Sequence, residues 1–333
     1  MRAILVEKFG EPEALALREV PAPVPGPGDV LIEVHAAGVN YPDYLVAGGK
    51  YQKLAPLPFI IGKEGAGLVL AVGPGVSRVK PGQRVAFEVE AGAFAEQVCV
   101  RQGMCFPVPD GVPMVAAAAL GLAYQTAWYG LHECGRIKAG DWVLVTGAAG
   151  GVGVAAVQLA RAAGANVIAG LGTMSKADFV RAHGAQAVVD LAQPQLNEVL
   201  RDQIHAITAG RGLDIVVDMV GGDAFSASLR AMAEGGRMLV VGFTSGVIPQ
   251  VKANYLLLKH LSVIGVNWSG WRDAPDTFEA TQAQAKIFAL AASGRMASPV
   301  SATFALEDAP RAVAALRDRS FVGKMVLIVK PGA

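Results

Sequence analysis

Residues 142–165 read WVLVTGAAGGVGVAAVQLARAAGA, and this stretch decides the fold. An apolar strand runs straight into a glycine-rich turn and then into a helix that Gly164 is placed to end. The turn glycines are Gly147, Gly150, Gly151 and Gly153. Glycines let a backbone come close to a diphosphate, and a helix N-terminus offers unpaired N–H groups to that anion. The spacing GAAGGVG differs from GxGxxG, but the strand–turn–helix context favours dinucleotide binding over a turn that only packs closely.

The chain that follows this turn alternates strands with helices. The helix that follows should bury Val154, Val157, Leu159 and Ala160. The further apolar strands are NVIAG, AVVDL, DIVVDMVG, RMLVVGF and LSVIGVNW, and SKADFVRAHG is a further helix. Near-continuous Val, Ile and Leu is typical of a parallel sheet covered on both faces. The pattern predicts a doubly wound α/β domain over residues 121–269.

Residues 1–120 have a different pattern, with short apolar runs separated by PAPVPGPGD, GPG and KPG. Many short strands without a helical period predict a barrel-like or sandwich-like β-rich unit. From about residue 270 the chain reads helix (276–293), strand, helix and a last strand, KMVLIV. This tail is too short for a domain, so we expect residues 270–333 to return to residues 1–120. The α/β domain would then be inserted into a discontinuous β-rich domain.

Composition excludes several function classes. A length of 333 residues at roughly 150 residues per domain favours two domains. The net charge of +1, with no basic run, argues against a nucleic-acid partner. The N-terminal apolar run is too short for a signal peptide, and no segment offers the ~20 uncharged apolar residues of a membrane helix. We therefore expect a cytoplasmic protein with no membrane partner. Three cysteines without CxxC spacing argue against disulfides and a structural zinc site.

The second strand of the α/β domain bears on the choice of cofactor. An NAD site commonly has Asp or Glu at that strand end, but here the chain reads Ala169-Gly170-Leu171-Gly172-Thr173. The missing acid leaves room for a 2′-phosphate, which Lys176 could bind, although Asp178 could partly neutralise that charge. We therefore predict NADPH. Because ligands bind at the carboxyl ends of such strands, the expected contacts are Gly147, Ala149, Gly150, Gly151, Val152, Gly172, Thr173, Lys176, Met219, Val220, Gly242, Phe243, Val266 and Asn267. We expect Asp218 to be structural.

Several motifs together resemble the medium-chain dehydrogenase/reductase superfamily in its zinc-free quinone oxidoreductase branch. They are AAGVNYPD (36–43), LPFIIGKEGAG (57–67), GAFAEQ (92–97), TGAAGGVG (146–153), DMVGGDAF (218–225), GGRMLVVGF (235–243) and FVGKMVLIV (321–329). The resemblance implies a GroES-like catalytic domain, an inserted Rossmann-type domain, NADPH and a cleft between the domains. It also implies a homodimer that pairs through the last Rossmann strand, LSVIGVNW.

The resemblance also assigns roles to single residues. Asn40 and Asp43 match cleft residues of the branch, Tyr51 matches a tyrosine at the cleft mouth, and Thr126 matches a threonine near the nicotinamide. Two positions depart from the pattern. Leu45 stands where some quinone reductases have a tyrosine, with Tyr44 beside it. Leu191 replaces a tyrosine near the 2′-phosphate.

Metal chemistry is not expected. A catalytic zinc needs three ligands from Cys, His and carboxylates. Zinc-dependent relatives have Cys at Asn40 or its neighbour Tyr41, and His at Lys63. Without a Lewis acid, a conjugated acceptor is the easier substrate, because its charge spreads onto an oxygen that ordinary donors can stabilise.

The candidate donors are Asn40, Tyr44, Tyr51 and, weakly, Lys63, which could instead be a surface lysine or pair with a structural Glu64. The first hypothesis for function is NADPH-dependent reduction of quinones, a small-molecule electron acceptor. The alternatives are reduction of α,β-unsaturated carbonyls or enoyl-thioesters, and an NADPH-binding protein with a structural or regulatory role.

Overall fold

The computed structural model describes residues 1–273 and 278–330. The chain divides into two compact units, one made of residues 1–123 with the segment that begins at residue 275, and one made of residues 124–274. The domain boundaries expected from the sequence, at 120/121 and 269/270, stay a prediction. Among the described residues, no helix has the length and apolar character needed to cross a membrane.

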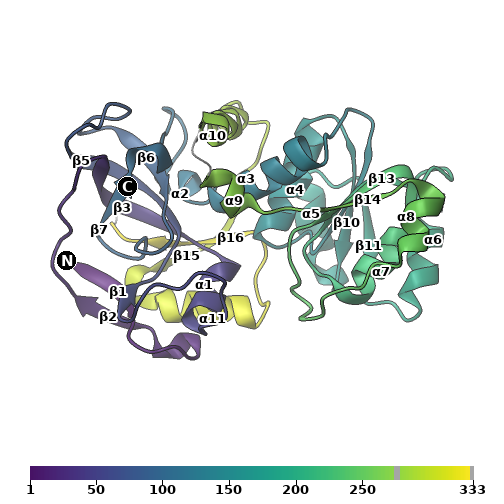
Figure 1. Ribbon diagram of the computed structural model, residues 1–333, viewed down its shortest axis with the longest axis horizontal. Coiled ribbons are helices and arrows are strands. Elements are labelled where there is room, and N and C mark those ends of the chain that lie inside the picture. Colours follow the sequence, from purple (N-terminus) through teal and green to yellow (C-terminus); the bar gives the residue numbers. More distant parts are fainter. Residues whose placement is uncertain (274–277, 331–333) are drawn as a thin grey trace. The chain divides into compact units, whose positions relative to one another are not determined.

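The second unit is built on a parallel sheet of six strands, seen in teal and green in Figure 1. Its strand order is β11-β10-β9-β12-β13-β14, so the order reverses between β9 and β12. The strands are β9 (Trp142–Thr146), β10 (Asn166–Leu171), β11 (Ala187–Asp190), β12 (Leu213–Asp218), β13 (Met232–Val240) and β14 (Ser262–Gly265). Numbered from β9, this is the order 3-2-1-4-5-6 of the doubly wound dinucleotide-binding fold. The predicted α/β class is confirmed.

Helices connect these strands, and one more follows the last strand. They are α4 (Gly151–Ala162), α5 (Ala177–Ala182), α6 (Leu196–Ile207), α7 (Gly222–Arg230), α8 (Ala253–Lys259) and α9 (Trp268–Arg272). A short 3₁₀ helix, η4 (Met174–Lys176), precedes α5. The four apolar residues expected to face inward from α4 are at most 1% exposed, so the helical period was interpreted correctly. A core of Leu144, Ile168 and Val216 from the sheet packs with Leu200 and Phe225 from the helices.

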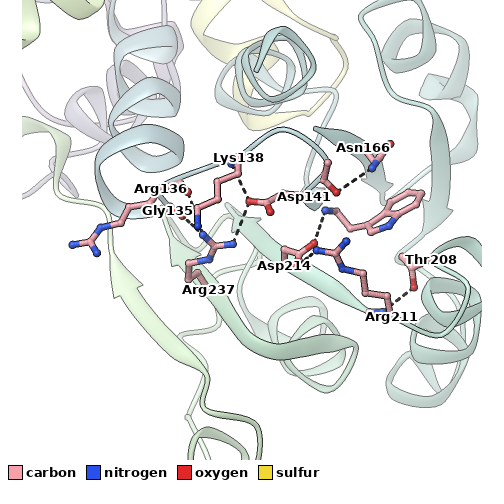
Figure 2. A network of polar contacts seen from close by, with 12 residues as sticks. Gly135, Arg136, Lys138, Asp141, Asn166, Thr208, Arg211, Asp214 and Arg237 are labelled. Carbon is pink, nitrogen blue, oxygen red and sulfur yellow. Dashed lines mark hydrogen bonds and ion pairs between the residues drawn. The ribbon is translucent and has the colours of Figure 1, made fainter. Parts of the chain in front are cut away.

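Charged side chains on β12 and β13 form hydrogen bonds to the start of β9 and to the loop before it (Figure 2). Arg237 on β13 donates to the carbonyl of Gly135 (2.7 Å) and to Asp141 (3.2 Å), just before β9. Asp214 on β12 accepts the Trp142 N–H (2.8 Å). These contacts connect β12 and β13 to the amino end of β9 and the loop before it. The opposite edge, where the strands end, is the one that binds ligands in such sheets.

The first unit contains two sheets. The smaller has the order β2-β1-β4, and the larger has the order β15-β16-β3-β5-β6-β8, with β7 also paired to β3. The strands are β1 (Arg2–Val6), β2 (Ala16–Glu19), β3 (Asp29–Val39), β4 (Phe59–Ile60), β5 (Glu64–Val72), β6 (Arg84–Glu88), β7 (Gln97–Arg101), β8 (Cys105–Pro107), β15 (Val300–Ala305) and β16 (Lys324–Ile328). β16 pairs antiparallel with β3, so the last strand returns to the N-terminal unit.

The first unit also contains helices, and several of them interrupt the β-rich pattern of residues 1–120. The helices are η1 (Pro12–Ala14), α1 (Tyr41–Ala47), η2 (Gln102–Met104), α2 (Met114–Ala117), α10 (Phe278–Ala292), η5 (Leu306–Asp308) and α11 (Ala309–Arg317). The helix predicted over 276–293 is α10, and positions 276 and 277 lie outside the described residues. α2 is followed along the chain by α3 (Leu122–Trp128) and a π-helix, η3 (Tyr129–Cys134).

Candidate active site

The parallel sheet brings the expected cofactor residues to one edge. β9, β10, β12, β13 and β14 run in the same direction, so their carboxyl ends lie on the same side (Figure 1). The residues that follow these ends are Gly147 to Val152, Gly172 to Lys176, Met219 and Val220, Gly242 and Phe243, and Val266 and Asn267. The edge therefore collects the residues that the sequence predicted from five separate strands.

The glycine turn between β9 and α4 has a backbone that only glycine fits. Gly147 has φ +61°, a left-handed conformation that L side chains rarely adopt. A Cβ on Gly153 would lie 2.3 Å from the Gly147 carbonyl oxygen and 2.7 Å from the Ala148 Cα, so strand and helix approach each other closely. Gly150 precedes α4, whose first N–H groups have no partners within the helix. This turn fits the diphosphate of a dinucleotide.

A buried carboxylate holds the ends of β9 and β12 together. Asp218 accepts the Thr146 hydroxyl (2.5 Å) and the Gly221 N–H (3.0 Å), and the Thr146 oxygen accepts the Met219 N–H (3.1 Å). Burial raises the pKa of Asp218, which these hydrogen bonds partly offset. Asp218 therefore shapes the turn that carries Met219 and Val220, in keeping with the structural role expected for it.

The end of β10 presents polar groups and no acid. Thr173 and Ser175 are exposed, with their hydroxyl oxygens 3.1 Å apart, and Lys176 is half-buried. A Cβ on Gly172 would meet no atom within 4 Å. Leu191 covers the neighbouring Gly170. A Cβ added to Gly170 would lie 2.8 Å from the Leu191 side chain. Hydroxyls and an ammonium beside open space are groups that can bind a phosphate ester.

Two further residues expected to contact the cofactor, Thr126 and Asn267, lie in or directly before a helix. Thr126 is buried on α3. The Asn267 side-chain oxygen accepts from the Gly270 N–H (3.1 Å) and the Ser269 hydroxyl (3.1 Å), so it caps α9. In this geometry the side-chain oxygen of Asn267 is bound to its own helix.

In the first unit, α1 carries a buried acid. The Asp43 side chain is 0% exposed, and its Oδ2 accepts the Asn40 N–H at 2.8 Å. Its Oδ1 has no hydrogen-bond partner among the described residues. Burial raises the pKa of Asp43 to about 7, opposed mainly by that N–H and by the charges of Lys63 and Lys324. Asp43 is therefore placed to hold or release a proton near neutral pH.

Asn40, just before α1, belongs to a closed polar cluster. Its Oδ1 accepts from Lys324 Nζ (2.5 Å), and its Nδ2 donates to Glu64 Oε1 (2.7 Å). Lys324 and Glu64 form an ion pair at 2.7 Å, with side chains 2% and 1% exposed. Glu64 Oε2 accepts the Leu122 N–H (2.7 Å), the first residue of α3. We call Asn40, Glu64 and Lys324 the buried triad.

Lys63 does not pair with Glu64. It is 4% exposed, so the expectation of a surface lysine is wrong as well. Its Nζ donates to the Glu90 carbonyl oxygen (2.9 Å), lies 3.3 Å from the Glu90 carboxylate and sits 4.7 Å from the centre of the Tyr51 ring. Lys63 thus holds Tyr51 by a cation–π contact. Tyr44, half-buried, packs against Tyr41 with ring centres 5.8 Å apart.

Lys324 is the residue that sequence reasoning missed. It stands in FVGKMVLIV, a motif used only to support a resemblance. One signal was available, because Lys324 is the first residue of a strand that is otherwise apolar. A lysine is almost never fully buried unless it is paired, so a lysine there indicates a buried acid nearby.

Two protein families match the chain. "Zinc-binding dehydrogenase" matches residues 151–283, and "Alcohol dehydrogenase GroES-like domain" matches residues 26–110. The name of the first implies a metal, but the residues of this chain do not fit one. Asn40 and Lys63 stand at the expected ligand positions, and an ammonium from Lys324 contacts both Asn40 and Glu64. Within residues 1–273 and 278–330, no cluster of three His, Cys, Asp or Glu side chains could hold a metal ion.

Whole proteins match over nearly the full length. The mouse protein "Quinone oxidoreductase-like protein 2" is 36% identical over 331 residues, covering 99% of this chain and 92% of the mouse protein. The solved structure of Escherichia coli quinone oxidoreductase complexed with NADPH is 31% identical, with a TM-score of 0.90 over 99% of this chain and 100% of that one. A mycobacterial protein complexed with NADPH is 34% identical, with a TM-score of 0.91 over 99% and 100% of the two chains. The chain therefore belongs to the quinone oxidoreductases of the medium-chain dehydrogenase/reductase superfamily.

Proposed function

We propose that this oxidoreductase reduces quinones with NADPH and without a metal ion. The observation that carries the proposal is the buried triad, which puts an amide and an ion pair where zinc-dependent relatives are expected to place metal ligands. NADPH would supply a hydride. The chain's own residues then have to bind the acceptor, stabilise the oxygen that gains charge, and supply a proton.

The polar groups around α1 suit a conjugated acceptor. A quinone that receives a hydride places its charge on a phenolate oxygen, which neutral donors and a nearby cation can stabilise. Tyr44 and Tyr51 are half-buried phenols, and Lys63 adds a positive charge beside Tyr51. A simple ketone would instead form a strongly basic alkoxide, for which a Lewis acid is the usual solution. This difference in basicity favours quinones and enones over ketones.

Asp43 is the group best suited to supply the proton. Its pKa of about 7 leaves a large fraction protonated at neutral pH, and its Oδ1 makes no hydrogen bond among the described residues. A general acid works best when its pKa lies near the working pH. Asn40 is less suited to meet the acceptor, because its amide donates to Glu64 Oε1 and to the Gly38 carbonyl oxygen.

The acceptor class is tested by following NADPH oxidation at 340 nm with 9,10-phenanthrenequinone and with crotonyl-CoA. The proposal expects kcat/KM to be at least about tenfold higher for the quinone. A preference for crotonyl-CoA would support the alternative, reduction of enoyl-thioesters. Tight NADPH binding without oxidation by either acceptor would support a structural or regulatory role. An activity that depends on an alcohol and is lost with a chelator would contradict metal-free chemistry.

Lys176 provides a test of the cofactor. If its ammonium binds the 2′-phosphate, Lys176→Ala should raise the KM for NADPH about tenfold and leave the KM for NADH unchanged, because a charge-assisted hydrogen bond is worth roughly 1.5–3 kcal/mol. The measurement is steady-state kinetics with both cofactors. Arg181→Ala is a matched control, since Arg181 lies on the next helix and pairs with Asp178 (3.4 Å). Equal effects on NADPH and NADH would contradict the assignment.

We also propose a homodimer that pairs through the edge strand β14. β14 is the last strand of its sheet, and exposed apolar side chains accompany it in the second unit. They are Val247 (57% exposed), Ile248 (73%), Leu257 (76%) and Leu258 (74%). An unpaired strand edge beside such side chains favours association. Leu258→Glu should shift the mass in light scattering from dimer to monomer, whereas Val24→Glu, at 85% exposure in the first unit, should not. A monomeric wild-type protein would contradict the proposal.

A further inference from the structure

We propose that Lys324 is a positioning residue, which fixes the side chain of Asn40 and so the start of the helix that carries Asp43 and Tyr44. The residue comes from β16, far along the chain from α1, and no sequence motif links the two segments. The inference rests on the proposed function, because it assigns Asp43 and Tyr44 to the reaction.

The geometry identifies Lys324 as the centre of the buried triad. Its Nζ donates to Asn40 Oδ1 (2.5 Å), to Glu64 Oε1 (2.7 Å) and to the Val39 carbonyl oxygen (3.2 Å). Val39 is the last residue of β3, and Asn40 is the residue before α1. One ammonium therefore holds both the main chain and the side chain at the junction between β3 and α1.

These contacts also show what Lys324 does not do. An ammonium has three N–H donors, and all three are directed at protein oxygens. The side chain is 2% exposed. Lys324 therefore has no donor left for the oxygen of an acceptor, and it can act only through the groups that it holds.

The chain leaves room for Glu64 at two glycines. A Cβ on Gly38 would lie 2.4 Å from Glu64 Oε1, and a Cβ on Gly121 would lie 2.6 Å from Glu64 Oε2. Neither position has a left-handed φ, so backbone conformation alone does not call for glycine there. The space at Gly121 serves the carboxylate, whereas at Gly38 the Ala118 carbonyl oxygen, also 2.4 Å from such a Cβ, excludes a side chain as well. The carboxylate in turn accepts from Lys324 and Asn40.

The positioning reaches Asp43 through the backbone of Asn40. The Asn40 N–H donates to Asp43 Oδ2 (2.8 Å), and the Asp43 N–H donates to the Asn40 carbonyl oxygen (2.8 Å). If the backbone of Asn40 rotates, both hydrogen bonds to Asp43 are altered, and the direction of the Asp43 carboxyl group changes with them. Removing Lys324 should therefore weaken catalysis more than it weakens NADPH binding, which involves the other unit.

The test separates positioning from simple charge burial. Lys324→Met leaves Glu64 buried without its partner and should lower both Tm and kcat. Removing one partner of a buried pair is strongly destabilising, whereas replacing both is often tolerated. The double variant Lys324→Met/Glu64→Gln should recover most of the lost Tm. Its kcat with 9,10-phenanthrenequinone should stay at least about tenfold below wild type, with the KM for NADPH unchanged.

Lys330→Met is the matched control. Lys330 follows the same strand and pairs with Glu33 (2.8 Å), but its side chain is 52% exposed. An exposed pair contributes little to stability, so this variant should keep the wild-type Tm and kcat. A double variant that recovers kcat together with Tm would overturn the proposal, because Lys324 would then be needed only to neutralise Glu64.

Amide hydrogen exchange gives a second readout that does not depend on turnover. In the double variant, peptides that cover residues 40–47 should exchange about tenfold faster, while peptides that cover α6 of the second unit should not change. Unchanged exchange at residues 40–47 would overturn the proposal. If the wild-type protein reduces no acceptor, the proposed function fails, and the exchange experiment still decides whether Lys324 holds α1.

Discussion

Gly153→Val should abolish NADPH binding while leaving the first unit folded. The new Cβ would lie 2.3 Å from the Gly147 carbonyl oxygen, 2.7 Å from the Ala148 Cα and 2.8 Å from the Ala148 carbonyl carbon. All three are backbone atoms, so the turn itself has to move. Overpacking of this kind typically costs about 1–3 kcal/mol. Because the same turn would hold the diphosphate, we expect the Kd for NADPH to rise at least about 100-fold.

Isothermal titration calorimetry with NADPH measures this effect directly. Gly10→Val is the matched control, since a Cβ on Gly10 would lie 3.9 Å from its nearest neighbour, Ala14. This variant should bind NADPH like wild type. Wild-type affinity in Gly153→Val would mean that the diphosphate does not bind at this turn, and the assignment of the second unit as the cofactor-binding domain would have to be abandoned.

The second unit could be predicted from the sequence because its signals are local. The apolar strand, the glycine turn and the helical period lie within residues 142–165, and each indicates its own structure without help from distant residues. Parallel strands then bring their carboxyl ends to one edge as a matter of geometry. For this reason the positions after β9, β10, β12, β13 and β14 could be grouped from the amino-acid sequence alone.

The first unit could be predicted only in part, because its contacts are distant in sequence. α1 was not expected, since seven helical residues with a proline in the first turn interrupt a β-rich pattern too briefly to show a period. Lys324 and Asn40 are 284 residues apart, and no spacing rule connects them. The sequence predicts a site at Asn40, Asp43 and Lys63, but the polar partners of each depend on how β16 and β5 pair with β3.

Asp43→Asn should make the protein more stable at pH 8 and less active. The pKa of Asp43 is about 7 in the folded state, against about 4 in the unfolded chain. Between these values the folded state binds more protons than the unfolded state, so the free energy of unfolding of the wild type falls as pH rises from 4 to 7. Above pH 7 the loss is complete. Its size is on the order of 4 kcal/mol, from three pKa units at about 1.4 kcal/mol each.

The asparagine variant lacks this penalty. Its side-chain oxygen can still accept the Asn40 N–H, which now bonds to Asp43 Oδ2, so its Tm should exceed that of wild type by several °C at pH 8. The difference should disappear at pH 4. Glu33→Gln is a control of opposite sign, because Lys330 and His35 lower the pKa of Glu33. Because its pair with Lys330 is exposed and contributes little to stability, that variant should show no rise in Tm at pH 8, with kcat unchanged.

Measurements of kcat test whether the stability lost by burying Asp43 serves catalysis. If Asp43 supplies the proton, Asp43→Asn should lower kcat about 100-fold or more. The wild type should lose kcat as pH rises through about 7, and this decline should vanish in the variant. Active sites often keep a group that lowers the stability of the folded protein because the reaction needs it. A buried Asp43 that lowers the free energy of unfolding but raises kcat would be such a group. A variant that is more stable at pH 8 but keeps wild-type kcat and its pH profile would contradict the proton role. Asp43 would then act only as the acceptor that fixes the start of α1, and the proton would have to come from Tyr44 or Tyr51.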